Sequence, residues 1–205
     1  MPFLSQRQAI ASADSATELP AGVSWGDRSC AIACATMVLN HFGRRVTLDE
    51  VLDRALAAGA FDPARGWRHT GLVEVLQSFG MTAYRRNWRL LQGREAAYLG
   101  GRPLTASARE ELEIVAAQML EEGVGTIERL LAASVPVTVS IHRPWGDRTS
   151  LGHQVVLLAL DERSVSLHDP AADDGAAARY DRDALFGNWK GTAIVAHPPG
   201  FAQPQ

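Results

Sequence analysis

The sequence predicts an α+β protein in which N-terminal helices pack on a C-terminal antiparallel sheet. Apolar residues recur at helical spacing through most of residues 30–79, whereas β-branched and alternating segments dominate from residue 135 onward. A short turn at residues 161–163 links two of these later segments, which favours antiparallel neighbours. The chain of 205 residues is long enough to bury a substantial core.

The composition excludes several classes of protein. A hydrophobic content of 46% and a charged content of 21% are typical of globular proteins and exclude a wholly disordered chain. The net charge of −3 gives no general attraction to nucleic acid, and no run approaches the ~18 apolar residues of a membrane span. The N-terminus shows no Sec-type signal, and two cysteines four residues apart do not make a disulfide framework. We therefore expect a cytoplasmic protein that binds no nucleic acid; its oligomeric state is left open.

The helical part of the chain begins at residue 30. Residues 1–22 carry little pattern and predict an N-terminal arm, followed by one domain at residues 23–197 and a tail at 198–205. The apolar spacing predicts helices from residue 30 to about 42, from 48 to 59 and from 71 to 79. Thr47 and Glu50 have the spacing of a capping box for the second of these helices. An alternating strand is expected at residues 81–85.

Residues 86–125 predict a helical insert, with amphipathic spacing at residues 110–122 and a further helix around Leu130. A basic cluster precedes these predicted helices, and Trp88 and Tyr98 lie among the members of the cluster. Such a cluster either holds an acidic or peptide partner or forms a solvated face offset by the later glutamates, and we favour the second interpretation. The members of this basic cluster are Arg85, Arg86, Arg89, Arg94 and Arg102.

The C-terminal part predicts four strands. A β-branched strand is expected at residues 135–141, with Pro136 near its start, where a missing ladder donor does least harm. Residues 153–160 and 164–170 predict the two strands of a hairpin, and residues 192–196 predict the last strand.

Cys30 is the first candidate for chemistry. It falls in the first turn of its predicted helix, where the unpaired amide groups and the helix dipole favour a thiolate over a thiol. Cysteine is also among the residue types most often simply buried, so position alone does not establish a nucleophile. Cys34 lies one turn further along the helix and is predicted to be a core residue.

His153 and Asp169 are predicted to lie together, because they start and end adjacent strands of the antiparallel hairpin. Imidazole is the base that titrates near neutral pH, and a carboxylate on its other nitrogen fixes its tautomer. His142 and His168 compete for the role of base, but strand alternation should turn His168 away from Asp169. These residues lack the paired spacing typical of a metal site, so we expect neither a metal nor a cofactor.

Three segments carry a resemblance. Residues 28–39, residues 135–141, and Gly-His-Gln-Val-Val-Leu at 152–157 with His-Asp-Pro at 168–170 resemble the C39-like peptidase domain. This is a family of papain-like cysteine peptidases whose best-known members remove double-glycine leaders from bacteriocin precursors. The resemblance implies a papain-like peptidase fold, with Cys30 as nucleophile, His153 as base and Asp169 as the acid that orients it. The resemblance therefore implies a thiol protease of bacterial origin, with all three of these residues in one domain.

The sequence departs from that family in two places. Ala31 follows the nucleophile where the family usually has glycine, and a helix tolerates this change. The family also has a glutamine about six residues before the cysteine, which helps to bind the oxyanion, whereas this chain has Ser24 and Trp25 there. We expect Ser24, Trp25 or Arg28 to substitute for that glutamine. Losing one oxyanion donor typically costs ~10²–10³ in rate.

The sequence therefore predicts a cysteine-dependent hydrolase of peptide or amide bonds that acts through a thioester intermediate. Two alternatives stay open: a papain-like acyltransferase, or a peptide-binding domain in which the missing glutamine has weakened or abolished catalysis. The peptide or protein substrate is expected to lie in a cleft walled by aromatic-bearing loops, since loops on a rigid sheet commonly carry specificity. The residues predicted to line this cleft are Trp67, His69 and Trp145.

Overall fold

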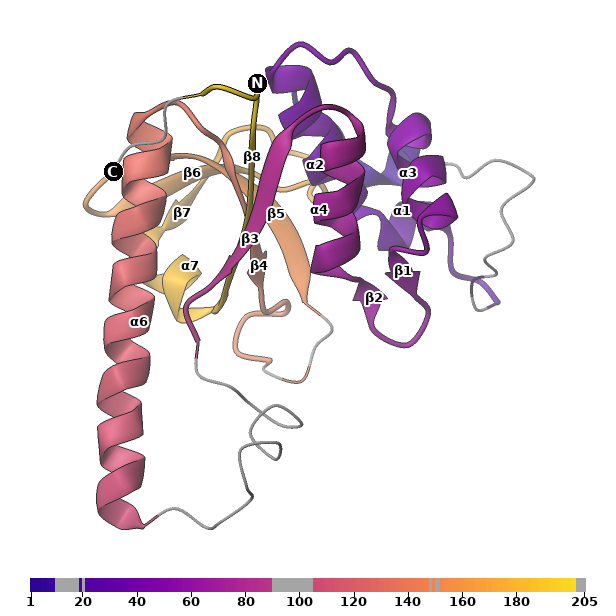
Figure 1. The fold of residues 1–205 in the computed structure, drawn as a ribbon. Helices are drawn as coiled ribbons and strands as arrows, with labels where there is room; N and C mark the ends of the chain where they lie inside the picture. Colours follow the sequence, from indigo (N-terminus) through magenta and orange to yellow (C-terminus); the bar gives the residue numbers. More distant parts are fainter. Residues whose placement is uncertain (10–18, 20, 90–104, 148, 150–151, 202–205) are drawn as a thin grey trace.

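The computed structural model describes residues 1–9, 19, 21–89, 105–147, 149 and 152–201. Parts of the predicted arm, insert and tail, including Arg94, Tyr98 and Arg102 of the basic cluster, lie outside these ranges. Within them, six strands form one antiparallel sheet in the order β3-β8-β4-β5-β6-β7, with helices on both of its faces (Figure 1). The predicted α+β architecture, with helices preceding the antiparallel sheet, is confirmed.

The elements follow the predicted order, with a few additions. The strands β1, β2 and β7 and the short helices η1, α1 and α7 were not predicted from the sequence. In chain order the elements are η1 (Gln6–Gln8), α1 (Trp25–Arg28), α2 (Cys30–His41), α3 (Leu48–Ala57), β1 (Phe61–Asp62), β2 (Gly66–Trp67), α4 (His69–Ser78), β3 (Thr82–Asn87), α6 (Ala106–Ala132), β4 (Val137–Ile141), β5 (His153–Leu160), β6 (Ser164–His168), β7 (Ala178–Asp181), α7 (Arg182–Gly187) and β8 (Trp189–His197).

The sheet separates two hydrophobic cores, because alternate residues of each strand face opposite sides. On one side α2, α3 and α4 cover the face that carries Val156 and Ile194. On the other side α6 covers the face that carries Val139 and Leu157. The predicted capping box of α3 is present, since Thr47 accepts from the Glu50 N–H and the Glu50 carboxylate accepts from the Thr47 N–H.

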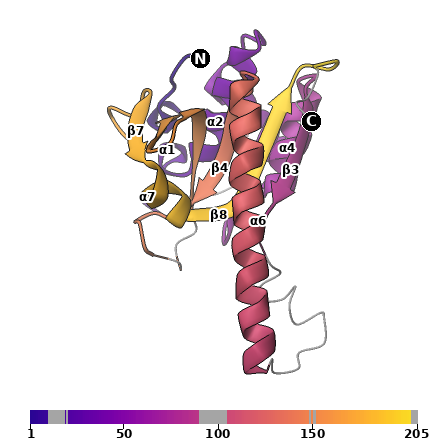
Figure 2. The same cartoon turned by 90° about the vertical axis from the view of Figure 1, so that its left-hand side faces the viewer.

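Helix α6 is continuous over 27 residues, whereas the sequence predicted two separate helices. The prediction was wrong because Gly123 and Gly125 interrupt the apolar pattern, although they do not interrupt the helix. The buried residues of α6 are Gly123, Ile127 and Leu130, all in its second half, and Figure 2 shows the first half extending beyond the sheet. Gly123 is the point of closest approach: a Cβ there would lie 2.7 Å from Trp189 Cη2 and 2.8 Å from Trp88 Cγ.

The two glycines of α6 give a matched test of this contact. Gly123→Ala should destabilise the fold by about 1–2 kcal/mol, because overpacking against two indole rings outweighs the gain in helix propensity. Gly125→Ala should instead stabilise it by about 0.5–1 kcal/mol, since its Cβ would meet nothing closer than Arg129 Nη1 at 3.7 Å. Urea unfolding of both variants checks the opposite signs. Two changes of the same sign would contradict the packing of α6 on Trp88 and Trp189.

The first residues of the chain pack against its C-terminal half. The Gln6 N–H donates to Pro170 O at 2.9 Å, and His168 Nε2 lies 3.1 Å from Met1 O. Arg7 Nη1 lies 2.6 Å from Asp173 Oδ1. The N-terminal segment therefore lies against the loop that follows β6.

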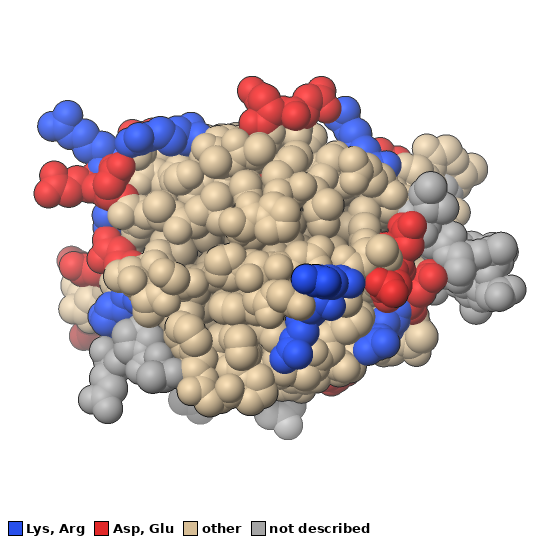
Figure 3. Space-filling view, turned by 90° about the horizontal axis from the view of Figure 1, so that it is seen from above, with Lys and Arg blue, Asp and Glu red and all other residues tan. Residues whose placement is uncertain are grey.

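Two surface properties complete the description. Among the described residues no helix combines the length and the apolar character needed to cross a membrane. Seen from above, much of the face is uncharged, with acidic side chains toward its edge and basic ones both at the edge and nearer the centre (Figure 3).

Candidate active site

Cys30 is the first residue of α2, so its thiol lies among the amide groups that a helix leaves unpaired at its start. The thiol is partly buried and receives hydrogen bonds from the backbone N–H groups of Ala31 and Gln154. It also hydrogen-bonds with the His153 ring. The helix start predicted from the sequence is thus the place where the thiol meets β5.

The His153 ring lies between the thiol and a carboxylate. His153 Nε2 is 2.7 Å from Asp169 Oδ1, and both side chains are buried. Because Nε2 is used by Asp169, Nδ1 is the nitrogen that faces Cys30. The two residues start β5 and follow β6, which pair antiparallel as expected from the sequence.

The charges of these three groups support one another. Burial alone would keep the thiol protonated, but the hydrogen bond and the charge of His153 outweigh it and lower the pKa of Cys30. Burial likewise opposes the imidazolium, but Asp169 and Cys30 raise the pKa of His153 to about 9. For Asp169 burial opposes ionisation, and His153, the Ala171 N–H and Arg143 lower the pKa of this carboxyl to about 2. These interactions favour the thiolate, the imidazolium and the carboxylate over the uncharged forms of the three groups.

Asp169 is held from several directions. Its Oδ1 accepts from the Ala171 N–H at 3.0 Å as well as facing His153. Its Oδ2 lies 2.6 Å from Arg143 Nη1 and 3.4 Å from the Tyr180 hydroxyl. Both oxygens thus face hydrogen-bond donors, and the carboxylate is fixed against the ring.

The competing residues lie elsewhere. His168 Nε2 faces Met1 O and its Nδ1 accepts from the Ala177 N–H at 2.9 Å, so this ring points away from Asp169 as strand alternation predicts. The His142 ring is buried just after the end of β4, and the side chain that hydrogen-bonds Cys30 is that of His153. Cys34 is fully buried in the core, where burial raises the pKa of its thiol well above the ordinary value. Both cysteines are free, as expected for their spacing.

A cavity of about 290 Å³ opens beside Cys30 and His153. Trp67 of β2 and His69 of α4 line it. His69 Nε2 lies 3.0 Å from Ser140 Oγ, and burial together with Arg85, Arg89 and Lys190 lowers the pKa of His69 to about 4, so this ring is neutral at pH 7. Trp145 lines a different cavity with Tyr180, whose ring centroid lies 5.6 Å from its own. This second cavity is also lined by Asp169 and Arg143.

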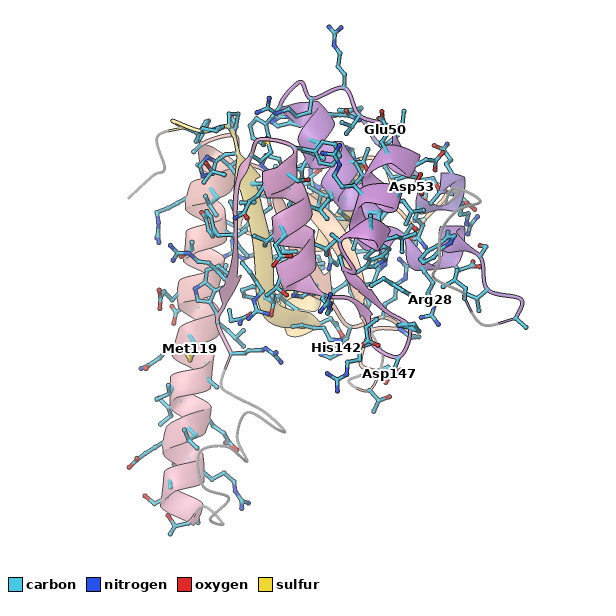
Figure 4. All side chains as sticks on the ribbon, turned by 45° about the vertical axis from the view of Figure 1, so that its right-hand side comes forward. Arg28, Glu50, Asp53, Met119, His142 and Asp147 are labelled. Atoms are coloured by element: carbon cyan, nitrogen blue, oxygen red, sulfur yellow. The ribbon has the colours of Figure 1, made fainter. Side chains whose placement is uncertain are left out.

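Of the three expected substitutes for the oxyanion glutamine, one lines the cavity. Arg28 does so, at the end of the molecule where Figure 4 also shows His142 and Asp147. The Ser24 hydroxyl is occupied by the capping box of α1, where it donates to Asp27 Oδ2 and accepts from the Asp27 N–H. The Trp25 ring packs against Phe61 at 5.2 Å between centroids.

Sequence reasoning missed a buried glutamine near this position. Gln6 lies far from Cys30 in the chain, but its Nε2 donates to Gly26 O at 2.8 Å, four residues before the thiol. A Cβ on Gly26 would lie 3.1 Å from the Arg7 backbone, so glycine allows the segments to approach this closely. No spacing pattern signals this contact, because residues 7–25 separate the two partners in the sequence.

The site and the fold together define a class. A cysteine at a helix N-terminus, a histidine at the start of an antiparallel strand and a carboxylate on the second ring nitrogen make the arrangement of papain-like cysteine peptidases. Residues 1–197 match the model of the Peptidase_C39 like family, and the chain belongs to that family.

Two solved structures share this fold. A putative C39-like peptidase from Bacillus anthracis is similar with a TM-score of 0.57 and 15% identity, over 96% of this chain and 94% of that one. The peptidase domain of Streptococcus ComA, a bi-functional ABC transporter involved in a quorum-sensing pathway, is similar with a TM-score of 0.51 and 16% identity, over 83% of this chain and 92% of that one. Among curated proteins no sequence matches this chain. At such identities the structural similarity concerns the fold, which is that of a C39 papain-like peptidase domain.

Proposed function

We propose that this protein is a cysteine-dependent hydrolase of peptide bonds. The observation that carries the proposal is the hydrogen-bonded array of Cys30, His153 and Asp169, which opens on a cavity of about 290 Å³. Membership of a peptidase family supports the same chemistry. We assign the roles of nucleophile to Cys30, acid–base to His153 and orienting carboxylate to Asp169.

The reaction would proceed in two steps. Cys30 Sγ attacks the carbonyl carbon, and the carbon–nitrogen bond breaks as His153 Nδ1 gives its proton to the leaving amine. Water then attacks the resulting thioester and loses a proton to the neutral ring, and the thiolate leaves. Asp169 stays ionised throughout and holds the ring in its tautomer.

The cavity offers a partner for the backbone of a peptide. Gln154 lines it and is 7% exposed, and within the described residues its Oε1 has no hydrogen-bond partner. An unsatisfied buried acceptor costs about 1–3 kcal/mol, which a donor from a bound ligand would offset. A peptide N–H is such a donor, and this supports an extended peptide as the substrate.

We further propose Gln6 as the side chain that assists the oxyanion, in place of the glutamine absent before Cys30. Its amide group is buried beside α1, and a primary amide has a second N–H in addition to the one that Gly26 O accepts. Gln6→Ala should lower kcat by about 10²–10³-fold. Alkylation of Cys30 should keep its rate, since alkylation forms no oxyanion. An unchanged kcat would exclude Gln6 from this role.

Alkylation by iodoacetamide tests the nucleophile directly. We expect Cys30 to be labelled rapidly well below the ordinary thiol pKa of about 8.5, because His153 stabilises its thiolate. Cys34 should stay unlabelled in the folded protein, because it is fully buried and its pKa is raised. The rate of labelling, read by mass spectrometry as a function of pH, measures both.

Matched variants complete this test. Cys30→Ser should abolish labelling and hydrolysis, whereas Cys34→Ser should preserve both. The thiolate–imidazolium pair should persist upward in pH until His153 loses its proton at about 9, where hydrolysis falls because the leaving amine has no acid. Labelling of Cys30 that begins only near pH 8.5 would contradict an activated thiolate.

A further inference from the structure

The cavity beside Cys30 has a basic wall, which we define as Arg85, Arg89 and Lys190. Arg85 is on β3, Arg89 follows β3, and Lys190 is on β8; all three line the cavity. They lie close enough together to lower the pKa of His69, after burial, through their charges. Arg89 and burial also lower the pKa of Lys190, while Asp147 acts in the opposite direction.

Few acidic groups offset this wall within the described residues. Cationic side chains outnumber acidic ones along the cavity, because Arg28 and Arg65 also line it and the acidic lining residue is Asp27. The Asp27 carboxylate already accepts from the N–H and the hydroxyl of Ser24. The opposite end of the molecule differs, because there both signs of charge are interspersed (Figure 3).

The register of the sheet places Arg85 of the basic wall on the face that α2 covers, and α2 carries Cys30. Arg85 pairs with Ile194, Ile194 with Thr138, and Thr138 with Val156, so these four residues form one row on the face that α2 covers. Neighbouring strands lie about 4.8 Å apart, so β3 lies about 14 Å from β5 across this face.

Lys190 reaches back toward the nucleophile. A Cβ on Gly152, the residue before His153, would lie 2.7 Å from Lys190 Nζ. The basic wall thus extends from the neighbourhood of His153 to about 14 Å away, a span of about four residues of extended peptide.

We propose that the basic wall selects substrates with a carboxylate within about four residues of the scissile bond. This inference rests on the proposed function and adds the class of substrate to it. The carboxylate belongs either to an acidic side chain or to the C-terminus of the peptide, and both would meet Arg85, Arg89 and Lys190 in the same way. Two members of the basic cluster predicted from the sequence, Arg85 and Arg89, are exposed and also line the cavity.

A pair of alkylating agents tests the wall without knowledge of the natural substrate. Iodoacetate and iodoacetamide attack the same thiolate and differ in charge, so the ratio of their rates at Cys30 reports the electrostatic potential of the cavity. In Arg85→Gln/Arg89→Gln we expect this ratio to fall about three- to tenfold, and the ratio cancels any change in the reactivity of the thiolate itself. Arg163→Gln, in the turn at the far end of β5, removes one charge outside the cavity and should leave the ratio as it is.

The wild-type protein gives a second measurement that does not depend on a variant folding. Its iodoacetate rate should fall as sodium chloride is raised from about 10 mM to 1 M, while the iodoacetamide rate stays constant. A ratio that neither the double variant nor salt changes would overturn the basic wall. Slow iodoacetamide labelling in the wild type would instead overturn the proposed nucleophile, so the two failures are distinguishable.

Iodoacetyl peptides then separate the two sources of the carboxylate. Iodoacetyl-Gly-Gly-Asp-amide is compared with its Asn counterpart, and iodoacetyl-Gly-Gly-Gly as the free acid with its amide. Faster labelling by the Asp peptide assigns the wall to an acidic side chain, and faster labelling by the free acid assigns it to a C-terminus. Equal rates within both pairs would overturn the proposal for peptide ligands.

Discussion

His153→Ala is expected to lower kcat/KM for peptide hydrolysis by at least about 10⁴-fold, the largest effect that we predict. The substitution removes the group that stabilises the Cys30 thiolate and the acid that protonates the leaving amine. Without the imidazolium, burial of the thiol is no longer outweighed, so the pKa of Cys30 should rise. Iodoacetamide labelling at pH 6–7 should therefore slow as well, and the pH profile of labelling measures this shift.

His168→Gln is the matched control for the loss of an imidazole. His168 is also buried at this side of the sheet, but both of its nitrogens face backbone groups, Met1 O and the Ala177 N–H. This variant should keep the low-pH labelling of Cys30 in the folded protein. If His153→Ala labels like the wild type at pH 6–7, His153 does not activate the thiol.

Asp169→Asn is expected to lower kcat by about 10³–10⁴-fold, although the new side chain has the same shape. Both oxygens of Asp169 face donors: the His153 ring and the Ala171 N–H on one side, Arg143 and Tyr180 on the other. In either orientation of its amide, an asparagine must direct its NH₂ group at one of these two groups of donors, where it cannot accept a hydrogen bond. The pKa of His153 should then fall from about 9 toward its ordinary value of about 6.5, and the alkaline limb of the pH–rate profile should move with it.

A double variant identifies the cause. Arg143→Gln offers an amide oxygen in place of a cation, so adding it to Asp169→Asn should recover part of the lost kcat. Asp173→Asn, which breaks the exposed ion pair with Arg7, should leave kcat unchanged. The ionisation of Asp169 also contributes to the stability of the fold. Because its pKa is lower in the folded protein, this contribution is present above the ordinary pKa of about 3.9 and is lost as pH falls through about 2.

Local patterns were sufficient to predict much of this molecule. The strand at residues 153–160 was predicted with its observed bounds, because alternation and a short turn are properties of adjacent residues. The capping box at Thr47 and Glu50 fixed the start of α3 in the same way. The hairpin then determined the neighbours of His153, since the ends of antiparallel strands meet whatever the rest of the chain does.

Features that depend on distant segments were not predicted. The contact of Gln6 with Gly26 crosses 20 residues without a pattern, and the basic wall joins β3 to β8. Arg85 is exposed, as its charge predicts, but the sequence does not show that it also lines the cavity. The contact of Trp145 with Tyr180, 35 residues later, likewise has no local signal in the sequence.

The packing of the N-terminal segment has a consequence for the order in which the protein forms during synthesis. Helices α2, α3 and α4 close through local contacts and can form early, whereas Gln6 must wait for Pro170 and Cys30 for His153. Ribosomes release the chain in the N- to C-terminal direction, so Gln6 leaves the ribosome well before the residues that it packs against. An incomplete chain therefore contains Cys30 without His153, and the reactive thiolate that we propose can form only after both segments have been made and have packed together.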